Sequence, residues 1–381
     1  MAEIEPFHVM ALLGRARELE RAGRSIVHME IGEPDFPTPD PVVAAAQQAV
    51  AGGAVHYTPA LGLSELREAI AGFYAERHRL DIDPGRIVVT PGASGALLLT
   101  MGVLIDRDAE VLLADPGYPC NRHFARFVEG RARAVPVGPE TGYQLTPELV
   151  ERHWGERTVA VLLASPANPT GTLVPPEDIA RIAAFASERG GMLIVDEIYQ
   201  GLIYEGEACT ALSSGERLFV VNSFSKYFSM TGWRIGWLVA PEDYIGDIER
   251  LAQNIFLSAP TLAQHAALAA LRPQTLEILE QRRAAFRERR DFLLPALREL
   301  GFDIPVTPAG AFYLYAGCGR FTDDSFQFAA DLLEKAGVAV TPGRDFGEHA
   351  AERHLRFAYT TSLAQLEEGV ERLRRYLTAD A

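Results

Sequence analysis

Short apolar runs recur along this chain, with helix-like segments between them. The runs cover residues 87–90, 111–114, 132–137, 159–164, 192–195, 218–222 and 235–240. Between two of these runs, Ile179, Ile182 and Ala186 share one face of a helix expected over residues 175–189. Strands that are apolar without alternation are buried on both faces, which is typical of a mainly parallel sheet covered by helices. We therefore predict an α/β domain with its functional side chains at the carboxyl ends of the strands.

The rest of the chain predicts a smaller second domain. A helical stretch over residues 244–300 is broken at Arg272-Pro273, because proline removes a helix hydrogen bond. Shorter elements follow, namely strand-like pieces at 311–315, 338–341 and 355–359 and a closing helix at 363–377. We expect an N-terminal arm (1–40) that joins the small domain, a large domain (41–280) with a mainly parallel seven-stranded sheet between helices, and a small α+β domain (281–381). A cleft is expected between the two domains.

Charge and cysteine usage exclude several classes of protein. A formal net charge of -15 and a pI near 5.1 disfavour binding to nucleic acid. The three cysteines are scattered, and neither they nor the histidines have the spacing of a metal site. The N-terminus lacks the pattern of a signal peptide, and no apolar run reaches the roughly 20 residues of a membrane span. We predict a cytoplasmic protein without a metal, a membrane or a nucleic-acid partner.

Lysine is almost absent from the chain. Of the 36 Lys and Arg residues, only Lys226 and Lys335 are lysines. Lys335 lies near the end of an amphipathic helical segment, where a solvated cation suits the helix dipole. Lys226 instead follows the run L-F-V-V-N-S-F-S, at the carboxyl end of a predicted buried strand. Because a primary amine can lose its proton and form a Schiff base, whereas a guanidinium stays protonated, Lys226 is the candidate nucleophile.

Further polar residues follow the neighbouring runs. Asp196 ends the run M-L-I-V-D, and a buried carboxylate there requires a cationic partner. Asn168 lies between two prolines, which restrain the backbone and aim its amide. Arg234 has nearby glycines on both sides, and its guanidinium suits a phosphate or a carboxylate. Backbone amides at the expected helix start near Ser94 favour phosphate too, although this glycine loop fits neither dinucleotide nor P-loop spacing.

These groups together match one cofactor, pyridoxal 5'-phosphate (PLP). PLP has an aldehyde, a phosphate, a ring nitrogen that works best protonated, and a phenolic oxygen. The chain also resembles the fold-type-I, class I/II PLP-dependent aminotransferases, which are aspartate aminotransferase-like, from about residue 32 to residue 356. The landmarks are I-G-E-P-D-F, H-Y-T-P-A-L-G-L-S-E-L-R-E-A, P-G-A-S-G-A, D-P-G-Y-P, N-P-T-G, D-E-I-Y, S-F-S-K-Y-F-S-M-T-G-W-R-I-G-W and H-L-R-F-A-Y.

The resemblance implies roles for individual residues around PLP. Lys226 would hold the cofactor as a Schiff base and later move the substrate proton. Asp196 would pair with the pyridinium nitrogen. Tyr199 and Asn168 would hydrogen-bond the phenolic oxygen, and Tyr118 would stack on the ring. The phosphate would be bound by the backbone of Ala93 and Ser94 and by the side chains of Ser223, Ser225 and Arg234.

The resemblance also concerns the substrate and the assembly. Arg356 would bind the substrate α-carboxylate bidentately, with the backbone of Gly32 nearby. Tyr57 would reach the phosphate of a neighbouring subunit, which implies a homodimer with shared active sites. The chain departs from the family pattern at Ser165, where many relatives have asparagine, and at Ser94, where some have lysine.

We predict a ping-pong aminotransferase that moves an amino group from a 2-amino acid to a 2-oxo acid. A PLP-dependent carbon-sulfur β-lyase is the alternative on the same scaffold, because both reactions begin by removing the α-proton. A non-catalytic regulator fits less well, since such relatives carry a DNA-binding module and this chain has no basic segment. A nicotinamide dehydrogenase would need a G-x-G-x-x-G after its first strand. The amino donor stays open, because the motifs force no second arginine into a side-chain pocket.

Overall fold

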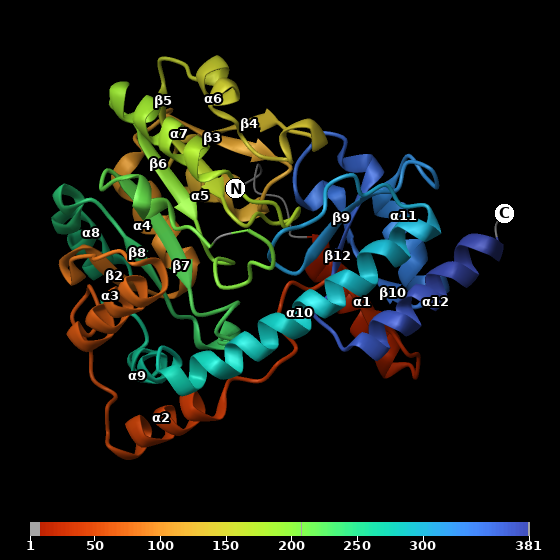
Figure 1. Ribbon diagram of the computed structural model, residues 1–381, viewed down its shortest axis with the longest axis horizontal. Coiled ribbons are helices and arrows are strands. Elements are labelled where there is room, and N and C mark those ends of the chain that lie inside the picture. The colour runs from red at the N-terminus through yellow and green to blue at the C-terminus, as the bar shows by residue number, and fades with distance from the viewer. Residues whose placement is uncertain (1–7, 207, 380–381) are drawn as a thin grey trace.

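The computed structural model describes residues 8–206 and 208–379 of the chain (Figure 1). Its largest sheet has seven strands in the order β2-β8-β7-β6-β5-β3-β4. Their bounds are β2 Ile87–Thr90, β3 Glu110–Asp115, β4 Arg131–Pro136, β5 Thr158–Ala164, β6 Met192–Asp196, β7 Leu218–Ser223 and β8 Gly236–Val239. Strand β8 runs antiparallel to both neighbours, and the other pairs are parallel. The predicted mainly parallel, seven-stranded sheet is confirmed.

The central strands are apolar because both faces of the sheet are covered. Every residue of β6 and of β7 is buried. Successive side chains of a strand point to opposite faces, so Leu193 and Val195 pack in one apolar cluster and Ile194 packs in the other. A strand in this setting has no polar side, which explains the continuous apolar runs in the sequence.

Helices cover both faces of this sheet. Their bounds are α2 Asp40–Ala51, α3 Ser64–His78, α4 Gly92–Leu104, α5 Pro119–Phe127, α6 Pro147–His153, α7 Pro176–Glu188, α8 Glu242–Ile255 and α9 Thr261–Ala270. Ile179 and Ile182 of α7 join the cluster on one face, whereas Leu97 of α4 and Ile248 of α8 join the cluster on the other. The sheet is therefore sandwiched between helices, as predicted.

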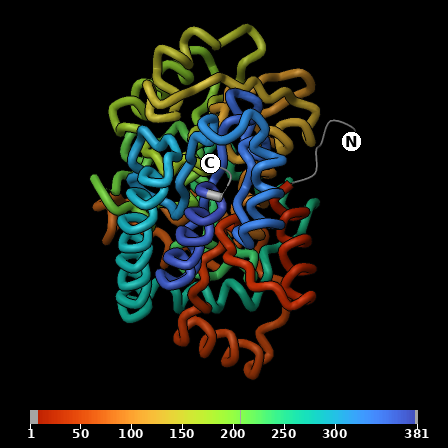
Figure 2. Tube along the Cα trace, turned by 90° about the vertical axis from the view of Figure 1, so that its right-hand side faces the viewer, coloured from red at the N-terminus to blue at the C-terminus, as the bar shows by residue number. Residues whose placement is uncertain are grey.

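The smaller part of the molecule is built from both ends of the chain. Its elements are α1 His8–Arg21, β1 Val27–His28, β9 Tyr313–Gly317, α11 Ser325–Asp331, β10 Val338–Ala339, β11 Thr341–Pro342, β12 His354–Ala358 and α12 Leu363–Ala379. β11, β12 and β9 form an antiparallel sheet in that order, and β1 pairs in parallel with β10. Figure 2 shows α1, in red, beside the blue C-terminal elements. The N-terminal segment thus packs with the C-terminal strands.

The long helix α10, Pro273–Leu300, runs from the large sheet to this smaller part (Figure 1). The predicted domain boundary between residues 280 and 281 falls inside α10, so the helix belongs to both sides of it. The predicted arm is described from His8 onward, and its first seven residues lie outside the described residues. The division into domains stays a prediction.

Two predicted elements differ from the structure. The stretch 244–300 breaks at α10 as expected, but it also breaks between α8 and α9, where Leu257 has a φ of +64° and Pro260 precedes α9. Residues 338–341 are two short strands, because β10 pairs with β1 whereas β11 pairs with β12. Both differences arise from pairing and turn geometry, which apolar patterning alone does not encode.

Candidate active site

The carboxyl ends of β5, β6 and β7 meet beside the start of α4. The sheet register places Asp196, at the end of β6, between Ala164 of β5 and Val221 of β7. A cavity of about 300 Å³ opens at this edge. The predicted residues that line it are Gly32, Ala93, Ser94, Tyr118, Asn168, Asp196, Tyr199, Ser225, Lys226, Arg234 and Arg356. Residues far apart in the sequence are therefore brought to one cavity.

Lys226 lies three residues beyond β7, with its amine in the cavity. Its Nζ donates a hydrogen bond to the carbonyl oxygen of Gly32 over 2.6 Å. Removal from bulk water lowers the pKa of this amine to about 8, and the positive charges of Arg356 and Arg234 act in the same direction. The amine therefore exchanges its proton near neutral pH, as a base for carbon acids must.

Asp196 is a buried carboxylate, 5% exposed. Burial raises its pKa to about 6, while the N–H of Ile198, donated to Oδ1 over 3.0 Å, and the charge of Lys226 oppose that rise. The sequence led us to expect a cation facing this carboxylate. Lys226 is the cation whose charge acts on it in the structure. Pairing with a ring nitrogen of a cofactor stays a prediction.

Two glycines allow close packing where α4 begins, Gly92 against Arg234 and Gly236 against the backbone of Ala93, and together they form a cradle. A Cβ on Gly92, which has a φ of +71°, would lie 2.8 Å from Nη2 of Arg234. A Cβ on Gly236 would lie 2.9 Å from the backbone nitrogen of Ala93. The guanidinium and the first amides of α4, including that of Ser94, thus converge on one place, which is an arrangement that binds phosphate.

Two serines support this cradle from the end of β7. The hydroxyl of Ser225 lines the cavity, whereas Ser223 lies one step behind it and is 1% exposed. The Oγ of Ser223 donates to Oγ of Ser225 over 2.9 Å and accepts the backbone N–H of Ser225 over 3.0 Å. Ser223 thereby orients the serine that faces the cavity.

Arg356 is a buried cation on β12, 3% exposed. Its Nη1 donates to Oδ1 of Asn168 over 3.0 Å, and its Nη2 donates to the carbonyl oxygen of Glu30 over 2.6 Å and to Oγ1 of Thr341 over 3.2 Å. Its Nε has no hydrogen-bond partner within the described chain. A buried guanidinium with spare donor capacity beside a cavity is suited to a carboxylate ligand.

Sequence reasoning missed several residues of this site, including Glu30 and Thr341, which contact Arg356, and Tyr313. The hydroxyl of Tyr313, on β9, lies 2.8 Å from that of Tyr199, and the ring of Tyr313 lies 4.3 Å from the guanidinium carbon of Arg356. Residues 311–315 were expected to be a strand, and strand alternation puts Tyr313 and Tyr315 on the same face. Nothing in the sequence says which side of this strand meets the large sheet.

Two predicted tyrosines differ in their placement. Tyr118, just before α5, is half-buried and lines the cavity, and burial raises the pKa of its hydroxyl above the usual range. Tyr57 lies outside the cavity with a side chain that is 82% exposed. Exposed apolar side chains occur close to Tyr57 in the chain, at Val50 and Val55, and at the end of α8 and in the turn before α9, at Ile255 and Leu257. The hydroxyl of Thr261 holds the loop at Tyr57 to α9 through the carbonyl of His56, over 2.8 Å.

A larger cavity of about 1090 Å³ adjoins the first one. The two share Tyr118, Ala164 and Asn168 in their linings. The larger cavity lies between α5 and the segment 344–352, and Arg122 and Arg344 are among its basic residues. The candidate site thus has room beyond Tyr118 for a substrate side chain.

Two negative findings concern the described residues. Among residues 8–206 and 208–379, no group of three or more His, Cys, Asp or Glu side chains could hold a metal ion. No helix within these ranges is long and apolar enough to cross a membrane.

Comparisons with known proteins agree with the geometry. The family described as "Aminotransferase class I and II" matches residues 24–373. The chain is 37% identical to the valine–pyruvate aminotransferase of Mycobacterium tuberculosis, over 99% of this chain and 97% of that protein. It is 38% identical to the aspartate/prephenate aminotransferase of Thermus thermophilus, over 98% of this chain and 97% of that protein. A solved aminotransferase structure from Mycobacterium tuberculosis superposes with a TM-score of 0.96 at 37% identity and covers 99% of this chain and 98% of that one.

Proposed function

The chain belongs to the class I and II aminotransferase family and is an aminotransferase, and from this premise we propose that it works with PLP on a 2-amino acid and a 2-oxo acid. Members of this family depend on PLP. We propose a ping-pong sequence, in which the donor leaves as its 2-oxo acid before an acceptor takes up the amino group. The observation that carries this proposal is the Lys226 amine. Its pKa of about 8 suits proton transfer, and it lines the same cavity as Arg234 and Arg356.

The cradle at the start of α4 supports a phosphate-bearing cofactor. Glycine at positions 92 and 236 leaves the space that a Cβ would fill beside Arg234 and Ala93. Free amides at a helix start, a guanidinium and the hydroxyl of Ser225 are together the donors that a phosphate needs. These residues would hold the phosphate of PLP.

The other lining groups fit the ring of PLP. Asp196 would keep the ring nitrogen protonated, Asn168 and Tyr199 would hydrogen-bond the phenolic oxygen, and Tyr118 would lie against the ring. Lys226 supplies the primary amine for covalent attachment. When bound, PLP supplies an electron-accepting ring that stabilises negative charge at the substrate Cα.

Lys226 also suits the proton transfer that transamination requires. A neutral amine takes up a proton, and the charged amine returns it, so an amine with a pKa of about 8 can do both near neutral pH. The carbonyl of Gly32 accepts a hydrogen bond from Nζ and thereby orients it. The same amine would move the proton in both half-reactions.

Arg356 would bind the α-carboxylate of both substrates. Its hydrogen bonds to Asn168, Thr341 and the Glu30 carbonyl hold the guanidinium in one orientation before substrate arrives. A pre-oriented cation loses little freedom on binding, and it fixes the substrate Cα relative to Lys226.

The substrate side chain would extend towards the larger cavity. The relatives named for valine and pyruvate and for aspartate and prephenate are equally similar to this chain, so their names do not choose a donor. Arg122 and Arg344 line the larger cavity together with the carboxylates of Asp115, Glu348 and Glu352, and the Arg122 guanidinium would bind a side-chain carboxylate of the substrate. A screen of amino donors against pyruvate and 2-oxoglutarate, repeated with Arg122→Gln, tests this proposal. Dicarboxylate substrates should lose activity selectively in the variant, and an equal effect on all substrates would exclude the role of Arg122.

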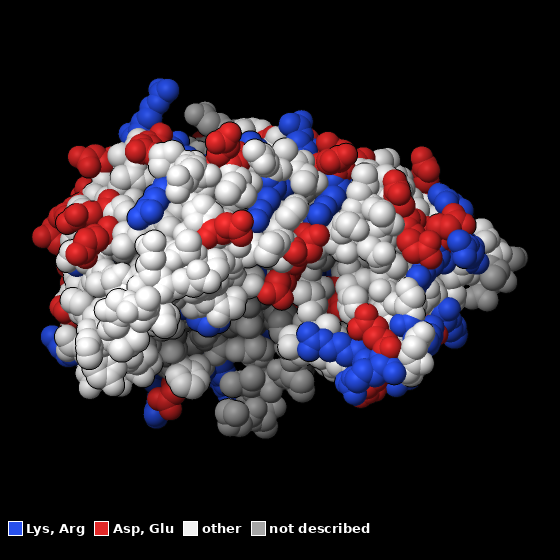
Figure 3. Space-filling view, turned by 90° about the horizontal axis from the view of Figure 1, so that it is seen from below, with Lys and Arg blue, Asp and Glu red and all other residues white. Residues whose placement is uncertain are grey.

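We also propose a homodimer with shared sites. Tyr57 and the exposed apolar side chains near it form a surface that a second copy of the chain would cover. In Figure 3 a broad, mostly uncharged area lies at the lower left of the view, in the half in which Figure 1 places α2, α8 and α9. A cytoplasmic location is part of the same proposal, because the three cysteines are unpaired.

The assay for the proposed reaction measures product formation from PLP-loaded protein. Formation of a new amino acid that requires both a donor and an acceptor supports transamination. Release of pyruvate and ammonia from a sulfur amino acid without any acceptor would instead favour the β-lyase. Lys335→Arg is the matched control for Lys226→Arg, since Lys335 is the only other lysine and lies on the surface, 3.0 Å from Asp331.

A further inference from the structure

Tyr313 lies where three groups of the candidate active site meet. Its side chain lines the cavity and is 1% exposed. Its hydroxyl lies 2.8 Å from the hydroxyl of Tyr199, and its ring lies 4.3 Å from the guanidinium carbon of Arg356. Tyr199 is the residue proposed to bind the phenolic oxygen of PLP, and Arg356 is the residue proposed to bind the substrate carboxylate. Tyr313 thus contacts both a cofactor residue and a substrate residue.

The third group is the segment that orients Lys226. A Cβ on Gly32 would lie 1.8 Å from the hydroxyl oxygen of Tyr313, so only glycine leaves room for this hydroxyl. The carbonyl of Gly32 accepts the hydrogen bond from Nζ of Lys226 over 2.6 Å. The hydroxyl of Tyr313 therefore lies between Gly32 and the hydroxyl of Tyr199.

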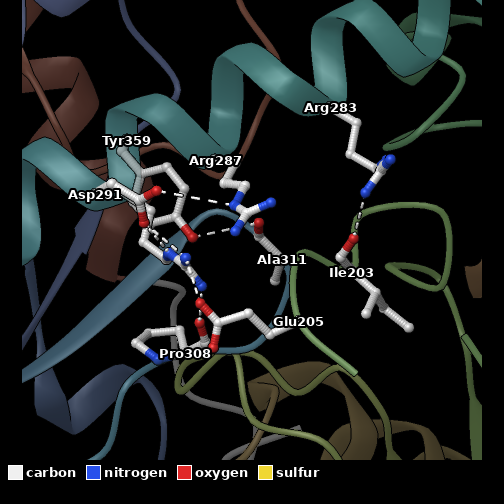
Figure 4. A network of polar contacts seen from close by, with 9 residues as sticks. Ile203, Glu205, Arg283, Arg287, Asp291, Pro308, Ala311 and Tyr359 are labelled. Carbon is white, nitrogen blue, oxygen red and sulfur yellow. Dashed lines mark hydrogen bonds and ion pairs between the residues drawn. The ribbon is translucent and has the colours of Figure 1, made fainter. Parts of the chain in front are cut away.

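Hydrogen bonds from other segments hold the chain just before Tyr313. The carbonyl of Ala311 accepts a hydrogen bond from the hydroxyl of Tyr359 over 3.4 Å, and the carbonyl of Pro308 accepts one from Arg290 of α10 over 2.7 Å. Figure 4 shows Pro308, Ala311 and Tyr359 gathered beneath α10. A backbone held by such contacts supports the side chain of Tyr313 in positioning its neighbours.

Either hydroxyl can be the donor in the hydrogen bond between Tyr199 and Tyr313, and the group that Tyr199 binds sets the direction. Burial raises the pKa of both phenols, so both keep their protons at neutral pH. A hydroxyl has one proton to donate, so when Tyr199 donates to the phenolic oxygen of PLP, as proposed, its oxygen is left to accept the O–H of Tyr313. The O–H of Tyr199 then points to the cavity. A hydroxyl that accepts a hydrogen bond becomes a stronger donor.

We propose that Tyr313 is a positioning residue for the reaction: its hydroxyl orients and strengthens the donor of Tyr199, and its ring holds the guanidinium of Arg356 in place. The proposal rests on the proposed binding of PLP, because the acceptor for Tyr199 would be the phenolic oxygen of that cofactor. One tyrosine thereby joins the cofactor side of the cavity to its substrate side.

The hydroxyl and the ring of Tyr313 are tested separately. Tyr313→Phe removes the hydroxyl and keeps the ring, whereas Tyr313→Leu removes both. Tyr315→Phe is the matched control, since Tyr315 lies two residues along β9, is 4% exposed, and its hydroxyl has no hydrogen-bond partner within the described residues. The first readout is the pH midpoint of the visible absorption change of PLP-loaded protein.

The expected results follow from the loss of one hydrogen bond. By donating to the phenolic oxygen, Tyr199 stabilises negative charge there and favours the deprotonated chromophore. Tyr313→Phe weakens this donor, and it should therefore raise the pH midpoint by about 0.5 to 1 unit. The KM of amino donors should change little in this variant. Tyr313→Leu should shift the midpoint similarly and also raise KM several-fold, because Arg356 loses its contact with the ring. Tyr315→Phe should match the wild type in both measurements.

A second measurement asks whether the effect passes through Tyr199. In a Tyr199→Phe background, the additional Tyr313→Phe change should leave the midpoint where Tyr199→Phe alone puts it. Additive shifts would overturn the proposed route, as would an unshifted midpoint in the Tyr313→Phe single variant. A wild-type protein that takes up no PLP would contradict the proposed function itself, and this result is distinct from a PLP-loaded protein with an unshifted variant.

Discussion

The Nζ of Lys226 donates a hydrogen bond over 2.6 Å to the carbonyl oxygen of Gly32, a residue 194 positions earlier in the chain. This contact joins the end of β7 to the segment that follows β1. The contact orients the Lys226 amine, and burial of this amine lowers its pKa to about 8. The base of the proposed reaction is thus positioned by both parts of the molecule.

Replacing Lys226 by arginine should abolish transamination. Arginine keeps the positive charge, but it stays protonated and cannot act as the base or the attached amine. Turnover should fall by at least about 1,000-fold. Steady-state rates of Lys226→Arg and Lys335→Arg check this, and Lys335→Arg should behave as the wild type.

Asp196→Asn should stabilise the PLP-free protein while it impairs the enzyme. The pKa of Asp196 is raised to about 6, so the folded state holds its proton more tightly than the unfolded state. This carboxyl therefore lowers the free energy of unfolding as the pH rises from about 4 to about 6, by roughly 3 kcal/mol in total. Thermal unfolding of the PLP-free proteins should give a higher Tm for the variant at pH 7 and equal values near pH 3.

The same variant should lose about 100-fold or more in turnover, because asparagine carries no charge to hold the proton on the ring nitrogen. An Asp196→Asn enzyme with normal turnover would show that this carboxylate is structural only.

Arg356→Lys should weaken the binding of amino donors although the substitution keeps the positive charge. An ammonium cannot bind a carboxylate bidentately while it also replaces the contacts to Asn168 and the Glu30 carbonyl. The value of kcat/KM should fall by about 10- to 100-fold. Arg353→Lys is the control, since Arg353 lies three positions earlier and is half-exposed beside Asp323. Equal losses in both variants would contradict the assignment.

Arg234→Gln should weaken the binding of PLP more than it weakens the fold. The guanidinium that lies against Gly92 is removed from the phosphate cradle. Titration of the PLP-free protein should show a Kd for PLP that is about 10- to 100-fold higher than in the wild type. Arg217→Gln removes a surface guanidinium paired with Asp243 and should leave the Kd unchanged.

The large sheet could be predicted from the sequence because its central strands must be apolar on both faces. Burial on both faces leaves uninterrupted apolar runs, and the predicted run 87–90 coincides with β2. The residues brought to the cavity from β5, β6 and β7 were found for the same reason. Asn168, Asp196 and Lys226 each lie within four residues of the end of an apolar run, and parallel strands end at one edge of the sheet.

The contribution of the smaller part could not be read in this way. Tyr313 and Glu30 enter the site through contacts between segments more than a hundred residues apart, and Thr341 enters it from β11, the strand beside Arg356. A short strand in a small sheet has side chains on two faces, and its sequence does not say which face meets the rest of the molecule. Tyr313 was therefore invisible as a site residue until Tyr199 and Arg356 were seen on either side of it.

Reduction with borohydride tests the central claim most directly. PLP-loaded protein is reduced, digested and examined by mass spectrometry, with Lys226→Arg and Lys335→Arg in parallel. The account predicts a pyridoxyl group on the peptide that contains Lys226, in the wild type and in Lys335→Arg, and an unmodified peptide in Lys226→Arg. A pyridoxyl group on Lys335 instead of Lys226, or no modified peptide at saturating PLP, would contradict it.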